Sequence, residues 1–234
     1  MRVVGKVVAL ARFPVKSMAG EAMEAVELRW TGLAGDRPYA FVQQGNHGRF
    51  PWLTGRELSE LVRYRPRFAD PADPRASAVT VEAPDGTSFD LRDPALAARL
   101  SAESGRASAL IQIGRGIFDS MPVSIVTTQS LARLEVAHGA ALDPRRFRIN
   151  VLIESDEPES AWAGRRLAFG DGTELLVNDP IPRCAMVTIC PDTARRDPSV
   201  LRTVAQLFDN HLGHYAAAAR LGVIRPGDTV RLLD

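Results

Sequence analysis

The feature that most constrains this chain is a repeated alternation of short β-branched runs with glycine or proline turns. Apolar, extended-type runs occupy residues 3–13, 25–30 and 39–43, and glycines punctuate the segments between them. Runs of this kind favour strands, and the turns end each strand after a few residues. Strict strand–helix–strand alternation is missing, so a doubly wound parallel sheet is disfavoured. The pattern predicts a mainly β fold with added helices (α+β), arranged as two mixed β-barrel units with peripheral helices.

Helix-type periodicity is confined to a few capped segments. Asp93-Pro94 opens one, which Gly105 ends, and Thr127 or Thr128 caps another, which ends at Gly139. Asp197-Pro198 opens the most amphipathic segment of the chain. The Thr54-Gly-Arg-Glu57 spacing of a capping box predicts a fourth, short helix.

The remaining segments read as strands and turns. A hairpin is expected around Asp85-Gly86, and strands are expected over 146–154 and 167–177, the latter broken at Asp171-Gly172. The chain closes with a Pro-Gly turn that leads into an alternating strand at 229–233. We expect two domains, covering residues 1–103 and 104–234.

Composition excludes several function classes. Lys+Arg number 29 and Asp+Glu 28, so a net charge of +1 offers no global field for nucleic acid or an anionic membrane. No apolar run approaches the ~20 residues of a membrane span, and the N-terminus lacks a signal-peptide pattern. The two cysteines, Cys184 and Cys190, supply neither a disulfide framework nor the four ligands of an iron–sulfur cluster. A reduced, cytoplasmic protein is expected.

Two cationic segments are candidates for binding an anion. If 146–150 is a strand, Arg146, Arg148 and Asn150 share one face, where two guanidinium groups and an amide suit a phosphate. Lys16 and Ser17 follow a proline after the first long strand and could hold a phosphate at the mouth of a barrel. Taken locally, a solvated strand face and an exposed turn are the favoured explanations of these two segments.

Two further turns are compatible with anion binding. Arg37 follows Gly35-Asp36 at a strand entry, and Ser120 lies in the turn Asp119-Ser-Met-Pro122 ahead of an apolar strand. Backbone N–H groups in such turns bind anions in many proteins. These turns and the Arg37 guanidinium are therefore compatible with an anion site.

Cys184 is the sharpest chemical feature. It follows Arg183 directly, behind Pro180 and Pro182, which indicate an irregular backbone. A neighbouring cation favours thiolate, which attacks electrophiles or binds soft metals, whereas many cysteines are simply buried and inert. A nucleophile pair of Cys184 with His211 or His214 is a further alternative, and the Cys/His spacing fits no zinc motif.

Taken in order, these segments resemble one known family. FPVKSMAG, LAGDRPYAFV, DSMPVSIVTTQSLARL, RRFRINVLIE, IPRCAMVTICPDT and GVIRPGDTVRLL follow one another along nearly the whole chain. The set resembles the MOSC superfamily, named after the C-terminal domain of molybdenum cofactor sulfurases. It is most similar to members with an N-terminal β-barrel partner, such as the mitochondrial amidoxime-reducing component and its bacterial relatives.

The resemblance implies a molybdenum cofactor, a pterin dithiolene that carries a phosphate. It implies that Cys184 is the thiolate on molybdenum and the catalytic metal ligand. It implies that the cofactor is held by a set of polar residues: Lys16, Ser17, Arg37, Ser120, Arg146, Arg148, Asn150 and Arg183. The chain departs from the family pattern at Ile149, Cys190 and Ala194, where the family has proline, aspartate and glycine respectively.

The functional expectation is an oxidoreductase that reduces small N-hydroxylated substrates. Electrons come from a separate donor protein, because the chain offers no iron–sulfur ligands and no nucleotide-binding glycine motif. The alternative is a carrier of molybdenum cofactor or sulfur that uses a persulfide on Cys184. A complete sulfurase, with its pyridoxal phosphate (PLP) domain, does not fit this length, so no PLP is expected.

Overall fold

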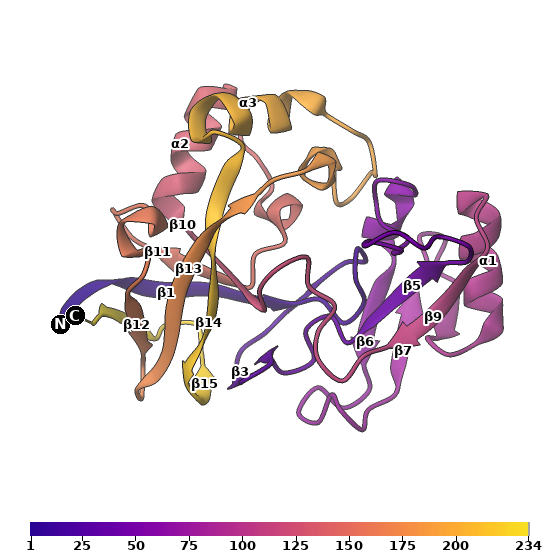
Figure 1. Cartoon of the computed structure of the whole chain (residues 1–234), viewed down its shortest axis with the longest axis horizontal. Helices are drawn as coiled ribbons and strands as arrows, with labels where there is room; N and C mark the ends of the chain where they lie inside the picture. Colours follow the sequence, from indigo (N-terminus) through magenta and orange to yellow (C-terminus); the bar gives the residue numbers. More distant parts are fainter. Residues whose placement is uncertain (234) are drawn as a thin grey trace.

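The computed structural model describes residues 1–233, and Asp234, the last residue of the predicted second domain, lies outside them. Figure 1 shows a barrel with two helices above it and, beside the barrel, a smaller unit with a third helix. Strand β1 (Arg2–Arg12) runs through the barrel toward the smaller unit. The two ends of the chain lie together because Arg2 pairs with Leu232.

A closed barrel of seven strands forms within the described residues. In hydrogen-bonded order the strands are β11 (Val151–Glu154), β10 (Val123–Thr127), β14 (His211–Arg220), β13 (Thr173–Pro182), β12 (Arg166–Phe169), β16 (Thr229–Leu232) and β1. Pairing of β1 with β11 closes the ring. β10 and β11 run parallel, and the two-residue strand β2 (Glu21–Ala22) extends the sheet at the far end of β1.

Buried side chains of these strands fill the barrel. Val151 and Ile153 of β11 are buried in strict alternation, as expected of a strand with one face in the core. On β1 the buried residues Val4, Val7 and Leu10 are three apart, because the register of this strand shifts between Val3 and Gly5 and between Val7 and Ala9. The β-branched run at 3–13 predicted this strand, and the prediction is confirmed.

Three α-helices are present in the described residues: α1 (Pro94–Ser104), α2 (Thr128–His138) and α3 (Pro198–Phe208). Each has the predicted N-cap, because the side chains of Asp93, Thr127 and Asp197 accept a hydrogen bond from a backbone N–H of the first turn. α2 and α3 pack together above the barrel around Leu134, Val200 and Val204. All three predicted helices are confirmed.

Small sheets surround a separate core in the first half of the chain. One sheet pairs β5 (Tyr39–Gln43) with β9 (Ser108–Gln112), and another joins β6 (Arg65–Phe68), β7 (Val79–Glu82) and β8 (Ser88–Asp90). A third small sheet, in which β3 (Val26–Arg29) pairs with β4 (Gly32–Leu33) and with β15 (Gly222–Ile224), packs instead against the barrel core. Tyr64, Leu96 and Leu100 are fully buried in this second core. The α+β architecture with a barrel is confirmed, and β1 belongs by its hydrogen bonds to the barrel.

Two local predictions are wrong. The capping box forms, since Thr54 N donates to Glu57 Oε2 at 2.9 Å, but only the 3-10 helix η1 (Ser59–Arg63) follows it. Pro66 lies too close for a longer helix, because a proline disfavours helical backbone at the residue before it. Residues 144–147 form a second 3-10 helix, η2 (Pro144–Phe147), where a strand was expected.

The segment that contains His211 and His214 is a β-strand and does not continue the preceding helix. α3 ends at Phe208, and both His211 and His214 lie on β14. His211 pairs with Pro182 and His214 with Pro180, and the register of β13 shifts on both sides of Pro180. The irregular backbone expected around the two prolines is therefore present. Two more 3-10 turns, η3 (Glu159–Trp162) and η4 (Ala185–Thr188), complete the described elements.

Candidate functional site

A cavity of about 310 Å³, here called the site cavity, opens between the barrel and the smaller unit. Its walls come from chain segments between residues 16 and 215. Nearly all of the predicted site residues line it: Lys16, Ser17, Arg37, Arg146, Arg148, Asn150, Arg183 and Cys184. Ser120 is exposed and does not line the site cavity, although its neighbours Asp119 and Met121 do.

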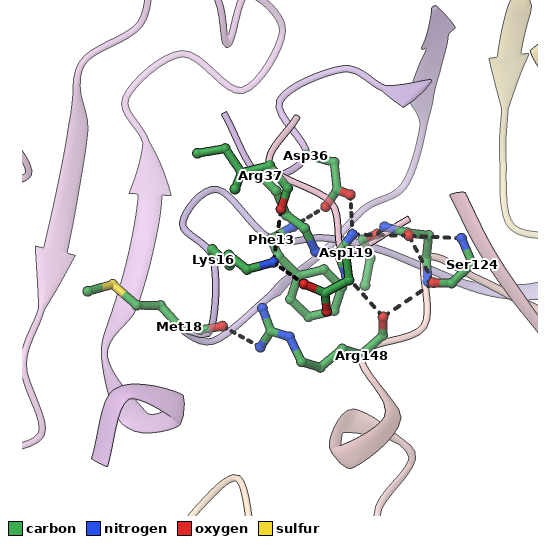
Figure 2. A network of polar contacts seen from close by, with 11 residues as sticks. Phe13, Lys16, Met18, Asp36, Arg37, Asp119, Ser124 and Arg148 are labelled. Atoms are coloured by element: carbon green, nitrogen blue, oxygen red, sulfur yellow. Dashed lines mark hydrogen bonds and ion pairs between the residues drawn. The ribbon is translucent and has the colours of Figure 1, made fainter. Parts of the chain in front are cut away.

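Lys16 lies in the loop after β1, at the base of the site cavity. Its Nζ donates to Asp119 Oδ1 at 2.7 Å and to the Ile117 carbonyl at 3.1 Å, as Figure 2 shows for Asp119. Burial lowers the pKa of Lys16, and the Asp119 carboxylate opposes that effect. The next residue, Ser17, has a φ of 66°, so the loop turns sharply there. The lysine thus brings a buried positive charge to the cavity wall.

Arg37 extends the positive wall from the other side of the loop. Its guanidinium group packs over the Phe13 ring at 4.6 Å, pairs with the buried carboxylate of Asp36 and donates to the Arg148 carbonyl at 3.3 Å. Asn150 Oδ1 lies 3.4 Å from Arg37 Nη1. These contacts hold the guanidinium in one orientation (Figure 2).

Arg148 is a half-buried cation of the site whose guanidinium is enclosed by other groups. It follows η2 with a φ of 52°, and its guanidinium lies 4.2 Å from the Phe13 ring centre. Nη1 donates to the Met18 carbonyl at 2.6 Å, whereas the buried Nη2 has no hydrogen-bond partner. Burial, with the nearby charge of Arg37, lowers the pKa of Arg148 to about 9. An anion in the site cavity would add a counter-charge to that of the nearby carboxylates of Asp36 and Asp119, which only partly offset the cost of burying Arg148.

Asn150 is a structural anchor of this wall. Its Oδ1 accepts from Ser124 N at 3.1 Å and Ser124 Oγ at 2.9 Å, and its Nδ2 donates to the Ala11 carbonyl at 3.0 Å. The expected common strand face of residues 146–150 is wrong, because η2 and the left-handed Arg148 intervene before β11 begins at Val151. Arg146, Arg148 and Asn150 nevertheless line one cavity, through a turn that folds them around it.

Cys184 stands between the end of β13 and the start of η4, and its side chain is exposed. Arg183 donates through Nε to the Leu212 carbonyl and through Nη1 to the Phe147 carbonyl, both at 2.8 Å. Burial lowers the pKa of Arg183 to about 10. The described hydrogen bonds of this guanidinium therefore go to backbone carbonyls, which join β14 to η2 beneath the thiol.

Arg146 completes the positive wall. Its Nη1 donates to the Thr188 carbonyl at 2.9 Å, and its buried Nε has no hydrogen-bond partner. Together with Arg148 Nη2, it gives the wall two unpaired donors.

Three residues in non-glycine, left-handed conformations cluster here. Ser17, Arg37 and Arg148 all have φ between 52° and 66°. Such a backbone costs about 1–2 kcal/mol per residue, and it persists at functional sites where the surrounding structure holds it. At each position the turn directs a polar side chain toward the site cavity.

Sequence reasoning missed several lining residues. Asp119 sits beside the predicted Ser120, and its acidic side chain next to a cationic site was an available signal. Tyr215 and Arg56 also line the site cavity. Arg56 lies within the capping box at 54–57, which carries no signal of a ligand site, and Tyr215 lies in a segment without a recognisable motif. Their positions depend on how distant segments pack.

Cys190 lies outside the lining of the site cavity. Its backbone accepts from Ala194 N in a tight turn, and Ala194 has a φ of 55° where the family pattern has glycine. A hydrogen bond with Thr193 lowers the pKa of the Cys190 thiol. Both cysteines are free. The departure from the family aspartate thus falls in a turn behind the site.

The donor set of the site cavity fits a phosphorylated ligand with a soft metal. Several cationic side chains and an exposed thiol line the same space, and two guanidinium nitrogens within its wall lack hydrogen-bond partners. Among residues 1–233, no group of three His, Cys, Asp or Glu side chains is arranged to hold a metal ion. A metal here would therefore rely on Cys184 together with ligands from outside the chain.

Comparison with known families decides the relationship. A family described as the MOSC domain matches residues 114–231, and one described as the MOSC N-terminal beta barrel domain matches residues 4–111. The chain belongs to the MOSC family. MOSC proteins are associated with binding of the molybdenum cofactor. The predicted boundary between residues 103 and 104 stays a prediction.

Comparison with solved structures shows the following similarities. The YUAD protein from Bacillus subtilis is 16% identical, with a TM-score of 0.53, and the match covers 99% of this chain and 97% of that one. YiiM from Geobacillus stearothermophilus is 17% identical over 49% of this chain and 55% of that one, with a TM-score of 0.40. No curated protein matches the sequence. Over residues 1–233, none of the helices has the length and hydropathy to cross a membrane.

Proposed function

We propose that this MOSC protein binds the molybdenum cofactor in the site cavity and reduces small N-hydroxylated compounds. The observation that carries the proposal is the convergence of Lys16, Arg37, Arg148 and the exposed Cys184 thiol on one space. These residues are far apart in sequence. If they only formed a solvated surface, their guanidinium groups would be hydrated by water, whereas here guanidinium nitrogens of Arg146 and Arg148 are buried without partners.

Different residues of the chain would hold the phosphate, position the backbone and ligate the metal. Lys16, Ser17, Arg37 and Arg148 would hold the phosphate end of the cofactor through charge-assisted hydrogen bonds. Asn150 and Arg183 fix the backbone on either side, and Cys184 would ligate molybdenum through its thiolate. When bound, the cofactor supplies two-electron chemistry at molybdenum.

The net reaction breaks the N–O bond of the substrate. Two electrons and two protons are consumed, and the reduced nitrogen compound and water are formed. A separate donor protein would deliver the electrons. The site cavity would position the substrate and exclude bulk water, which strengthens the interactions of its fixed charges.

A second candidate function is delivery of the cofactor or of sulfur, with a persulfide on Cys184. The exposure of this thiol favours it, because a carrier must present its sulfur to a partner protein. The same cationic wall would serve either role.

Metal analysis and turnover of protein made in a cofactor-competent host test both candidates. The reductase predicts about one molybdenum per chain and reduction of benzamidoxime by an artificial donor such as reduced methyl viologen. Cys184→Ala should abolish turnover, whereas Cys190→Ala, the matched control outside the site cavity, should retain it. A stoichiometric persulfide on Cys184 without molybdenum supports the carrier, and protein with neither molybdenum nor persulfide contradicts both.

A further inference from the structure

A second cavity, of about 380 Å³, lies on the other side of the Arg146–Arg148 wall. It is bounded by the outer face of β1 and β11, by β6 of the smaller unit, and by the turns around η2 and Ile189. Lys16, Arg37 and Cys184 line the site cavity and do not line this one. Its volume falls within the range of about 300–1,000 Å³ that is typical of small-molecule pockets.

The floor of the second cavity is apolar although it is the outside of a barrel. Ala9 pairs with Leu152 in the β1–β11 register, while their neighbours Leu10 and Val151 point into the barrel core. Ala9 is exposed and Leu152 is half-buried. Ile149 and Ile189 add apolar surface at the side. An outward face normally carries polar residues, so this floor is suited to covering by an apolar group.

Positive charge surrounds this apolar floor. Five arginines and two carboxylates line the second cavity: Arg65, Arg67, Arg145, Arg146 and Arg148 against Glu21 and Asp192. Both carboxylates are already matched within the protein, because Glu21 pairs with the buried Arg12 at 2.5 Å and Asp192 with Arg145 at 2.7 Å. Arg65 and Arg145 also pair with carboxylates, of Glu82 and Asp143. In the described part of the chain, the excess positive charge therefore comes from Arg67, Arg146 and Arg148.

Two of these arginines have free donors. Across residues 1–233, the guanidinium of Arg67 has no hydrogen bond or ion pair, and its side chain is exposed at the edge of the second cavity. Nε of Arg146 is buried in the shared wall without a partner. Unpaired cationic donors beside an apolar floor are complementary to a ligand with an anionic head and an apolar body.

We infer that the second cavity binds a small amphipathic anion, an aliphatic or aromatic carboxylate whose apolar part covers Ala9 and Leu152 and whose head meets Arg67 and Arg146. Arg146 and Arg148 line both cavities, so such a ligand would contact the same wall that faces the site cavity. The inference does not depend on molybdenum or on turnover.

Fluorescence titration of the full chain with anilinonaphthalenesulfonate, an apolar anion, tests the inference. We expect saturable binding at one site per chain, displaced by decanoate. Ala9→Trp fills the floor, and Arg67→Glu reverses a charge; each should weaken probe binding by at least about tenfold. Both residues are exposed, so the variants should fold, which circular dichroism would verify.

The controls carry the same substitutions on the exposed face of α2. Ala137→Trp and Arg133→Glu lie outside the lining of either cavity and should bind the probe like the wild type. Failure of the wild type to bind, or equal binding by Ala9→Trp and Arg67→Glu, would overturn the inference. None of these substitutions touches Lys16, Arg37 or Cys184, so that result would leave the proposed function standing.

Discussion

At the residue scale, the candidate site is built from charges that the protein only partly compensates. Arg148 makes one backbone hydrogen bond and stacks on Phe13, yet one of its nitrogens stays unpaired. Buried charges of this kind reduce stability unless a counter-ion is present. Without a bound anion, the charge of Arg148 therefore lowers the free energy of unfolding, and an anion in the site cavity would remove this loss.

Arg148→Met tests this interpretation. Because methionine fills similar space without a charge, the free energy of unfolding without ligand should fall by no more than about 1 kcal/mol, or should rise. Inorganic pyrophosphate should raise the melting temperature of the wild type and have little effect on the variant. Thermal unfolding at constant ionic strength measures both effects. An equal pyrophosphate shift in the variant would remove Arg148 from the anion site.

His214 predicts a pH dependence of stability. It is buried, its Nδ1 has no partner, and burial lowers its pKa below the usual 6.5. Between the folded pKa and 6.5 the unfolded chain binds more protons, so stability falls as the pH drops below 6.5. His214→Gln should lose less stability than the wild type between pH 7.5 and pH 5, as measured by urea unfolding. The exposed His47→Gln variant is the control and should follow the wild type.

At the element scale, Asp-Pro dipeptides show what the sequence predicts and what it hides. Asp93-Pro94 and Asp197-Pro198 were correctly interpreted as helix starts, because a periodic apolar stripe follows each. Asp143-Pro144 carries the same signal, and Asp143 Oδ1 accepts from Arg145 N at 2.8 Å at the start of η2. Residues 146–150 alternate polar and apolar side chains as a strand does. This pattern predicted a strand where the chain forms a turn.

The start of β14 contains a glycine that supports the thiol region. Gly213 has a φ of 81°, and its N–H donates to the buried Glu159 at 2.9 Å. The preceding carbonyl, of Leu212, accepts from Arg183. A Cβ at this position would lie 2.6 Å from Val126 Cγ2 and 2.7 Å from the Ile125 carbonyl.

Gly213→Ala should therefore destabilise the protein by about 3 kcal/mol, from backbone strain together with the clash. Gly45→Ala is the matched control, since Gly45 has a φ of 77° and no atom within 4 Å of its added Cβ. It should lose only about 1 kcal/mol. Urea unfolding compares the two, and equal losses would contradict the packing role of Gly213.

At the scale of the whole molecule, β1 makes the two halves of the chain interdependent. It lies between β11 and β16 and closes the barrel, although it comes first in the sequence. A segment of residues 104–234 alone would leave two barrel strands with unpaired edges, which favour aggregation. We expect this segment to be unfolded or insoluble by circular dichroism, and co-expression with residues 1–103 to restore a folded complex. A folded, monomeric 104–234 segment would contradict this.

The convergence of the site was predictable from the sequence only through the family resemblance. Local patterns identified the cationic turns and the Cys184 neighbourhood, but a solvated surface was the favoured local explanation of the cationic turns, and an inert cysteine explained Cys184 equally well. Tyr215 and Arg56 could not be found this way, because their places depend on how β14 and the loop after β5 pack against distant segments. The positions of Tyr215 and Arg56 are determined by packing between distant segments and not by any local sequence pattern.

The pairing of the first strand with the last also orders events during synthesis. β1 is made long before its partner β16, so the ring can close only after Leu232 has been synthesised. The lining of the site cavity reaches Tyr215, so its walls are incomplete until that residue has been made. A ligand that contacts all of these walls must therefore bind after Tyr215 has been added to the chain.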